Sequence, residues 1–242
     1  MTISEMHYDF KKKLNKVDSE QNRNLLVPEI DWALNEAQEL FIKMIVEPRQ
    51  RSFIGFEKSQ RTIDDIRTIV ESERVVTITN GVAPIPVDYL FFLKAEVLMD
   101  KGNCRGVKGR LHVRQHDDEF ENSPFDKSSF EWRVVNGLFI TEGVKVFDDG
   151  TFTNKSLVLS YIRKPSYIHN AQAFRNGTYQ LPSEVTLPQP GDVGVLARTC
   201  DCELPEHTHR EIVDIAVAMV SGELLSPDFQ VKLSKLNFNE LK

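Results

Sequence analysis

The sequence predicts an α+β fold in which N- and C-terminal helices form one bundle and an antiparallel, β-rich segment is inserted between them. Apolar residues recur at helical spacing near both ends of the chain, whereas the middle carries β-branched runs separated by turn signals. Neither helical part has enough apolar partners alone, so we expect the two to pack together. The predicted segments are an N-terminal helical part at 1–72, the β insertion at 73–165, an extended connection at 166–204 and C-terminal helices at 205–242.

The clearest N-terminal helix is predicted over 29–46. Its apolar residues recur every three or four positions, Pro28 suits the first turn of a helix, and Pro48 ends the run. A second helix is predicted over about 60–70 and a weaker one over 3–15. These helices supply the first half of the expected bundle.

The β-rich segment begins where the periodicity changes from helical spacing to alternation. Strands are predicted at 75–79, 90–98 and 110–114. Asn80-Gly81 and Lys101-Gly102-Asn103 are the turn signals between them.

Two hairpins are predicted after these strands. Asn136-Gly137 is the strongest hairpin signal in the chain, because a two-residue turn of this type needs positive φ at both central residues. It separates predicted strands at 131–135 and 138–141, and Asp148-Asp149-Gly150 separates predicted strands at 144–147 and 157–162. We therefore expect Asn136, Gly137, Asp148 and Asp149 at the tips of the insertion, away from the helices.

Helical periodicity returns at about 205–225 and again at 228–236. In the first of these helices, apolar residues cover roughly 200° of the surface, which is more than a one-sided surface helix needs. The extra width indicates either burial between two layers or a face kept for a partner. Val213, Val217 and Val220 are the interface candidates on this helix.

Trp32 lies on the polar side of the predicted 29–46 helix, beside Glu36 and Glu39. A large aromatic side chain on a polar face either packs under a loop of its own chain or contacts a partner, and Trp is enriched at interface hot spots. Phe125 and Phe238 are further interface candidates in polar surroundings, although single exposed apolar residues are normal.

The composition disfavours some classes of protein. The net charge of −6 is unlike that of a dedicated nucleic-acid binder, which needs a Lys or Arg for each phosphate contact. There is no apolar run of about 18 residues, so we expect no membrane span, and the N-terminus lacks the features of a signal peptide. Three cysteines give no disulfide framework, which fits a reducing cytosol.

Two groups of residues are candidates for metal chemistry. Cys200, Cys202, His207 and His209 are residue types that bind zinc, although paired ligands in structural zinc sites usually have a gap of about two to four residues. His116, Asp117 and Asp118 could serve a metal-dependent hydrolase or nuclease, or form a solvated acidic turn. No nucleophile elbow and no phosphate-binding loop of the Walker type occurs, so we expect no catalytic residue and no cofactor.

Several segments, in order, carry a resemblance to one family. They are 28–38, 85–90, 116–118, 124–129, 159–165 and 209–217, and together they span most of the chain. In these segments the chain resembles virion structural proteins of tailed phages, most closely the neck ring, or head-to-tail adaptor, proteins of crAss-like phages.

The resemblance implies a helical bundle with a β insertion that forms a ring, commonly of twelve copies, stacked on the portal protein. It implies no catalytic residues. The expected partners are other copies of the chain, the portal, neighbouring neck or tail proteins, and genomic double-stranded DNA that passes through the lumen without specific binding; no membrane is involved. The expected location is the neck of the virion, assembled in the bacterial host cytoplasm. A minor tail or capsid subunit at another position in the virion stays open as an alternative.

Overall fold

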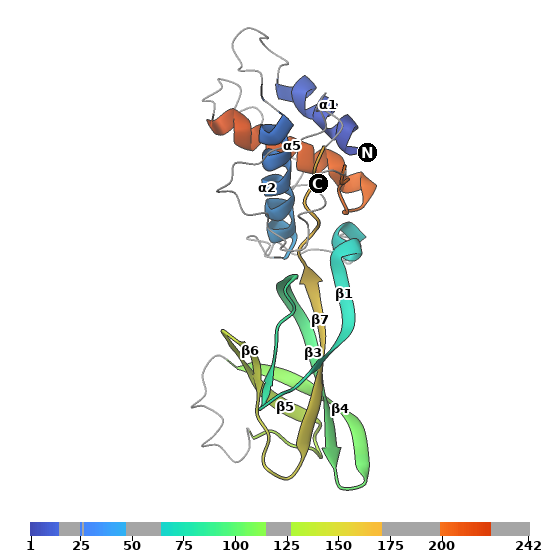
Figure 1. Cartoon of the computed structure of the whole chain (residues 1–242), viewed down its shortest axis with the longest axis vertical. Coiled ribbons are helices and arrows are strands. Elements are labelled where there is room, and N and C mark those ends of the chain that lie inside the picture. Colours follow the sequence, from blue (N-terminus) through green and yellow to red (C-terminus); the bar gives the residue numbers. More distant parts are fainter. Residues whose placement is uncertain (15–24, 26, 47–63, 115–126, 171–198, 224–242) are drawn as a thin grey trace, which may run out of the picture. The chain divides into compact units, whose positions relative to one another are not determined.

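The fold is mixed α/β and divides into two compact units. The computed structural model describes residues 1–14, 25, 27–46, 64–114, 127–170 and 199–223. One unit, here called the helical unit, comprises Met1–Ile69 and Pro165–Lys242; the other, the sheet unit, comprises Val70–Lys164 (Figure 1).

The helical unit contains α1 (Ile3–Leu14), α2 (Val27–Val46) and α5 (His209–Glu223), and residues 64–66 are also α-helical. Helix α5 packs against both α1 and α2, so N- and C-terminal segments share one core. The predicted helices at 3–15 and 29–46 are confirmed, and Pro28 lies in the first turn of α2. The predicted helix at 228–236 lies outside the described residues. No helix among the described residues is both long enough and apolar enough to cross a membrane.

The wide apolar arc of the C-terminal helix is buried within the chain. Val213 and Val217 are 0% and 3% exposed, and their neighbours Ile212 and Ala216 are fully buried. Packing of α5 against both α1 and α2 accounts for the width of the arc. Of the two predicted explanations, burial between layers is therefore the one that the described residues support.

The predicted helix at 60–70 is confirmed over 64–69 and ends one residue early. Residues 64–66 are α-helical, the 3₁₀ helix η1 (Arg67–Ile69) follows, and strand β1 begins at Val70. The next residues include Val75 and Val76, and strand β7 supplies backbone partners for them. Pairing with β7 thus starts where the helical segment ends, at Val70.

The sheet unit is a curled, seven-stranded sheet with the order β1-β7-β3-β4-β5-β6-β2. The strands are β1 (Val70–Thr77), β2 (Val82–Ala83), β3 (Tyr89–Lys101), β4 (Cys104–Arg114), β5 (Val134–Ile140), β6 (Gly143–Val146) and β7 (Thr153–Arg163). All neighbouring pairs are antiparallel except β4 and β5, which are parallel. The expectation of a wholly antiparallel insertion is wrong at this one pair.

Two of the predicted turns are confirmed. Asn80 and Gly81 have φ values of 53° and 77°, and Thr79 and Val82 bridge across them. Both central residues thus lie in the left-handed region that a tight hairpin turn needs. Gly102, at a φ of 57°, lies in the connection between β3 and β4, where Lys101 pairs with Cys104.

The predicted Asn136-Gly137 hairpin is wrong, because β5 runs straight through both residues. Gly137 pairs with Val113 of β4 on one side and Val146 of β6 on the other. A side chain at Gly137 would place a Cβ atom 2.7 Å from Cδ1 of Leu111 and 3.2 Å from the carbonyl oxygen of Lys145. The glycine therefore permits close packing inside the sheet, and the chain reverses at 141–142 instead.

The second predicted hairpin is also wrong, although its loop exists. β6 pairs with β5 and β2, whereas β7 pairs with β1 and β3. The two strands on either side of Asp148-Asp149-Gly150 are therefore not neighbours in the sheet. A local turn signal marks a reversal but does not determine which strands pair.

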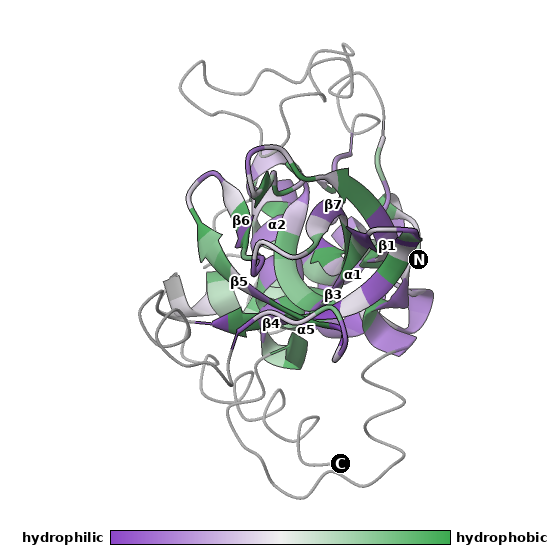
Figure 2. Ribbon diagram, turned by 90° about the horizontal axis from the view of Figure 1, so that it is seen from below, coloured by the Kyte–Doolittle hydropathy of each residue, from purple (hydrophilic) through white to green (hydrophobic). Residues whose placement is uncertain are grey.

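The core of the sheet unit comes from alternate residues of the central strands. Ala95, Val97 and Met99 of β3 and Leu157 and Leu159 of β7 are at most 3% exposed and belong to one apolar cluster. Glu96 separates Ala95 from Val97, whereas Leu98 and Val158 are apolar, and Figure 2 shows hydrophilic and hydrophobic stretches (purple and green) along the strands. This alternation places one face of each strand toward the core.

Candidate functional site

The residues suggested for a zinc site have separate partners. The Sγ of Cys202 donates to Oε1 of Gln38 at 3.3 Å, and burial raises the pKa of this thiol to about 12. Nε2 of His207 lies 2.6 Å from Oδ1 of Asp65. Cys200 is half-buried, and its Sγ contacts the backbone carbonyl of Asp201. A zinc ligand must be a thiolate at neutral pH, and the Cys202 environment opposes that.

His209, the fourth residue suggested for a zinc site, has backbone carbonyl groups as its partners. Its Nδ1 lies 3.1 Å from the carbonyl oxygen of Met1 and its Nε2 lies 2.8 Å from that of Leu204. The imidazole therefore joins the start of the chain to the turn before α5. Within the described ranges, no three His, Cys, Asp or Glu side chains lie together as metal ligands would.

Several predicted site residues lie outside the described residues. They are His116, Asp117, Asp118, Phe125 and Phe238. The hydrolase alternative and two of the interface candidates therefore stay predictions from sequence.

The interface candidates on helices differ in exposure. Trp32 is 54% exposed on α2, as its position on the polar face predicts. Val220 is half-buried at the end of α5. Val213 and Val217 are in the core of the helical unit, so a contact to another subunit through them would need this core to open.

An exposed tryptophan that the sequence did not point to lies in the sheet unit. Trp132 is 83% exposed in the turn at 129–134, which we call the tryptophan turn. Ser129 and Val134 close this turn with two backbone hydrogen bonds of 2.8 and 3.1 Å. Arg133 has a φ of 53°, and its carbonyl oxygen accepts a 2.7 Å bond from the amide of Arg110 in β4. Trp132 is thus presented by a turn that is fixed to the sheet.

Side chains on both sides of Trp132 fix the tryptophan turn further. The ring of Phe130 lies 6.1 Å from the ring of Phe152, and the Nζ of Lys101 lies 5.6 Å from the Phe130 centroid. The same Nζ donates to Oε1 of Glu131 at 2.6 Å, and this bond lowers the pKa of the Glu131 carboxyl. The turn is therefore attached to the end of the β3–β4 hairpin and to the loop before β7.

A shallow groove lies between the same two loops. It has a volume of about 420 Å³ and is lined mainly by polar residues. The lining residues, which together we call the polar groove, are 100–102, Arg105, 150–153 and Lys155. Lys101 and Phe152 belong to the groove and also contact the tryptophan turn, so the two features adjoin.

Asp148 and Asp149 lie in the loop beside the polar groove and are exposed. Oδ1 of Asp148 accepts a 3.1 Å bond from the amide of Gly150, and Oδ1 of Asp149 accepts a 2.9 Å bond from the amide of Thr151. Both carboxylates therefore stabilise their own loop. Asn136, which was also expected at a tip, is fully buried within β5. Its backbone carbonyl oxygen accepts a 2.9 Å bond from the backbone amide of Phe147.

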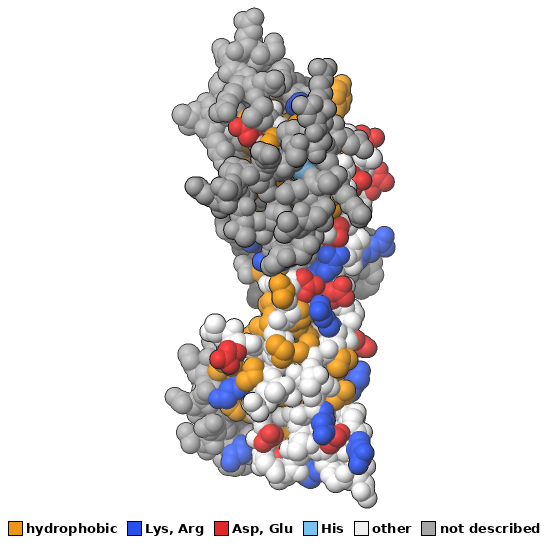
Figure 3. Space-filling view, in the orientation of Figure 1, with side chains coloured by type: hydrophobic (Ala, Val, Ile, Leu, Met, Phe, Trp, Pro, Cys, Tyr) orange, Lys and Arg blue, Asp and Glu red, His pale blue; other side chains and the backbone are white. Residues whose placement is uncertain are grey.

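Basic residues line the polar groove although the whole chain is acidic. Lys101 and Arg105 come from the β3–β4 hairpin and Lys155 comes from β7, about fifty residues later. Figure 3 shows Lys and Arg side chains (blue) spread over the end of the sheet unit at the bottom of the view, among fewer acidic ones.

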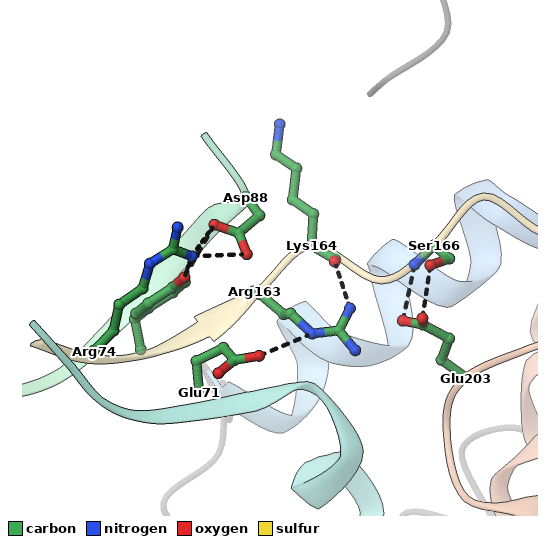
Figure 4. A network of polar contacts seen from close by, with 8 residues as sticks. Glu71, Arg74, Asp88, Arg163, Lys164, Ser166 and Glu203 are labelled. Atoms are coloured by element: carbon green, nitrogen blue, oxygen red, sulfur yellow. Dashed lines mark hydrogen bonds and ion pairs between the residues drawn. The ribbon is translucent and has the colours of Figure 1, made fainter. Parts of the chain in front are cut away.

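A separate polar cluster fixes the strands where β7 ends (Figure 4). The Oη of Tyr161 donates to Oδ1 of Asp88 at 2.9 Å, and Nη1 of Arg74 lies 2.7 Å from the same Oη. Burial, and then the Asp88 carboxylate, raise the pKa of Tyr161. Arg163 lies 3.6 Å from Glu71 across the β1–β7 pair. These bonds join β1, β7 and the residue before β3, which is a structural role.

The exposed tryptophans and the polar groove are thus the features of the described residues that invite a partner. Trp132 could have been noticed from the sequence only as an aromatic residue between two charged ones, Glu131 and Arg133. Comparison of the sequence with models of known protein families and with curated proteins finds no match.

Proposed function

We propose that the chain is a virion structural protein that forms a ring in the neck of a tailed phage, between the portal and the tail. The ordered resemblance described above motivates this proposal. The finer architecture belongs to it: a bundle of N- and C-terminal helices that carries the sheet unit as an insertion. Packing of α5 against α1 and α2, and a sheet unit made from one continuous segment, are compatible with that arrangement.

The observation that carries the proposal is the exposure of Trp32. The side chain is 54% exposed on a helix whose opposite face is buried in the core. Exposed tryptophan loses the free energy of burying a large apolar ring, and a contact with another protein recovers it. Tryptophan is also among the residues that most often dominate interface energetics. A protein that works by assembly accounts for such a residue without any catalytic group.

In the proposed ring, each copy contacts the next through two different surfaces, and closure of the ring completes every contact. A single weak contact is then repeated around the ring, commonly of twelve copies. The portal would serve as the template that raises the effective concentration of subunits. Genomic DNA would pass through the lumen of the ring without sequence-specific binding.

The experiment is to measure the mass of the purified chain by light scattering, alone and with its portal protein, at virion-like salt. We expect a monomer or small oligomer alone and a ring when the portal is present, visible by negative-stain microscopy. A chain that stays monomeric with the portal would overturn the proposal. Tight binding of a divalent cation together with DNA cleavage would instead support the hydrolase alternative.

A further inference from the structure

The charges in the polar groove are not balanced. Arg105 and Lys155 have no carboxylate within ion-pair distance in the part of the chain that the structure describes, whereas Lys101 is bonded to Glu131. Among the described residues, Asp100 is the only acidic one that lines the groove, and it accepts a 2.7 Å bond from the amide of Gly106. The groove therefore favours an anionic ligand.

The walls of the groove allow a ligand to come close to the backbone. Gly102 and Gly150 have φ values of 57° and 77°, and a Cβ atom at either position would meet no atom within 4 Å. Two loops thus present bare backbone to the open space of the groove. A linear polyanion fits such a surface, because its successive charged groups can each contact a different hydrogen-bond donor of the groove.

The groove offers little to the apolar side chains of a peptide. Phe152, the one apolar lining residue that the structure describes, is 4% exposed and packs inward against Phe130. Peptide recognition usually depends on apolar or aromatic anchors that enter pockets. A phosphodiester chain needs cationic and polar groups instead, and these are what the groove supplies.

Trp132 adds an aromatic surface beside these cations. Its exposed indole is presented by a turn whose neighbouring residues contact Lys101 and Phe152 of the groove. Aromatic rings next to a basic groove stack on the bases or sugars of a bound strand in many nucleic-acid-binding proteins. The combination is therefore more specific for nucleic acid than the cations alone.

We propose that the polar groove and Trp132 together form a contact site for the phosphodiester backbone of nucleic acid. Arg105 and Lys155 contact phosphates directly, and Lys101 contributes a third cation at the border with the tryptophan turn. The net charge of −6 opposes binding at a distance, so one chain binds weakly and with strong dependence on salt. The proposal rests on the proposed function only in naming the phage genome as the natural ligand; in a ring, the weak contact would be repeated once per subunit.

The test measures binding to the whole chain before any ring is formed. In a Trp32→Phe background, Trp132 is the only tryptophan left, since the chain has two. An oligothymidylate and a duplex of equal length are titrated at low salt, and both tryptophan fluorescence and the anisotropy of labelled DNA are followed. We expect quenching of Trp132 and a log–log salt slope of about −2 to −3, the value for three phosphate contacts.

The decisive comparison uses two double variants of equal charge. Arg105→Ala with Lys155→Ala removes both unpaired groove cations, and the slope should fall to about −1. Lys11→Ala with Lys12→Ala removes two exposed lysines of α1 in the helical unit and should leave binding unchanged within twofold. Equal losses in the two double variants would overturn the proposal, because binding would then follow net charge alone.

Two further outcomes bear on the ligand. If a poly-glutamate of equal charge binds as tightly and quenches Trp132 equally, the site is one for acidic polypeptides and the nucleic-acid proposal is wrong. Stronger quenching by the oligothymidylate than by the duplex supports stacking of unpaired bases, and equal quenching supports contact with the backbone alone. Ring formation with the portal is scored separately on groove variants that keep Trp32, because the proposed function places Trp32 at a contact between subunits. Normal rings without DNA binding by the parent chain would overturn this proposal only, and DNA binding without rings would overturn the proposed function only.

Discussion

Oδ1 of Asp31 in α2 lies 2.6 Å from Nε2 of His7 in α1, and the two side chains are 0% and 7% exposed. The second carboxylate oxygen lies 3.3 Å from Nδ1 of His169 and accepts a 3.2 Å bond from the amide of Asn170. One buried carboxylate thus joins α1, α2 and the segment that follows β7. A network of this kind stabilises a core only while all of its members are present.

Asp31→Ala should therefore destabilise the helical unit by roughly 3–5 kcal/mol, because it leaves His7 and the Asn170 amide buried without their acceptor. Urea unfolding followed by circular dichroism would measure the loss. Glu36→Ala, an exposed acidic residue on the same helix, should change stability by less than about 0.5 kcal/mol. Equal losses of unfolding free energy in the two variants would show that the buried contacts of Asp31 do not stabilise the helical unit.

Stability should fall in alkali through Cys202. Burial raises the pKa of this thiol from 9.0 to about 12, so the folded state holds its proton more tightly than the unfolded state. The stabilisation is complete below pH 9 and is lost as the pH rises toward 12, by roughly 4 kcal/mol in total. Cys202→Ala should flatten the pH dependence above pH 9, measured by denaturant midpoints. Cys104→Ala, at an exposed cysteine, should leave it unchanged. Tyr167, whose pKa burial also raises to about 12, accounts for a residual slope above pH 10.

The sequence predicted the helices better than the sheet. Helical spacing depends on one face of one segment, and it located α1, α2 and the start of the C-terminal helix within a few residues. Strand pairing depends on segments far apart: the order of β1, β7 and β3 could not be read from their own residues. Asn136-Gly137 shows the same limit, since the partners on both sides of β5 override a local turn preference.

The candidate site was predicted in part. The exposure of Trp32 follows from helical geometry alone, because Glu29, Asn35 and Glu36, three or four residues away on the same helix, are polar. Trp132 was missed because it falls within a stretch expected to be a strand. The polar groove was missed because Arg105 and Lys155 meet only when β3 pairs with both β4 and β7.

Gly137→Ala should destabilise the sheet unit by about 1–3 kcal/mol, the cost of placing an extra methyl group in a packed sheet. The clash involves the side chain of Leu111, so the cost should be smaller in a Leu111→Ala background. A double-mutant cycle on urea unfolding measures this coupling. Simple additivity would mean that the backbone of Lys145, rather than Leu111, limits the space.

Two pairs of substitutions at Asp148 and Asp149 separate the effect of charge on genome ejection from the effect of a changed loop structure. Asp148→Asn with Asp149→Asn removes two charges but keeps an oxygen that accepts the bonds from Gly150 and Thr151. Asp148→Lys with Asp149→Lys reverses the charge and also removes both hydrogen-bond acceptors. If the loop faces DNA in the ring, the Lys variant should assemble normally and slow genome ejection, with a smaller effect for Asn. Normal ejection by both variants would remove this loop from the path of the DNA.

Trp32→Ala should weaken association between subunits while leaving the fold intact. The side chain is half-exposed, so truncation removes little buried area from the monomer, and we expect a stability change of less than about 1 kcal/mol. At a subunit contact the same truncation should cost about 2 kcal/mol or more, the range of interface hot spots. Thermal unfolding of the chain alone and light scattering with the portal, performed on one preparation, measure the two effects. Tyr8→Ala, at a residue 72% exposed on α1, is the matched control for loss of an exposed aromatic ring. If Trp32→Ala lowers the melting temperature strongly but rings still form, the indole stabilises its own subunit, and the contact between copies must be sought elsewhere on the surface.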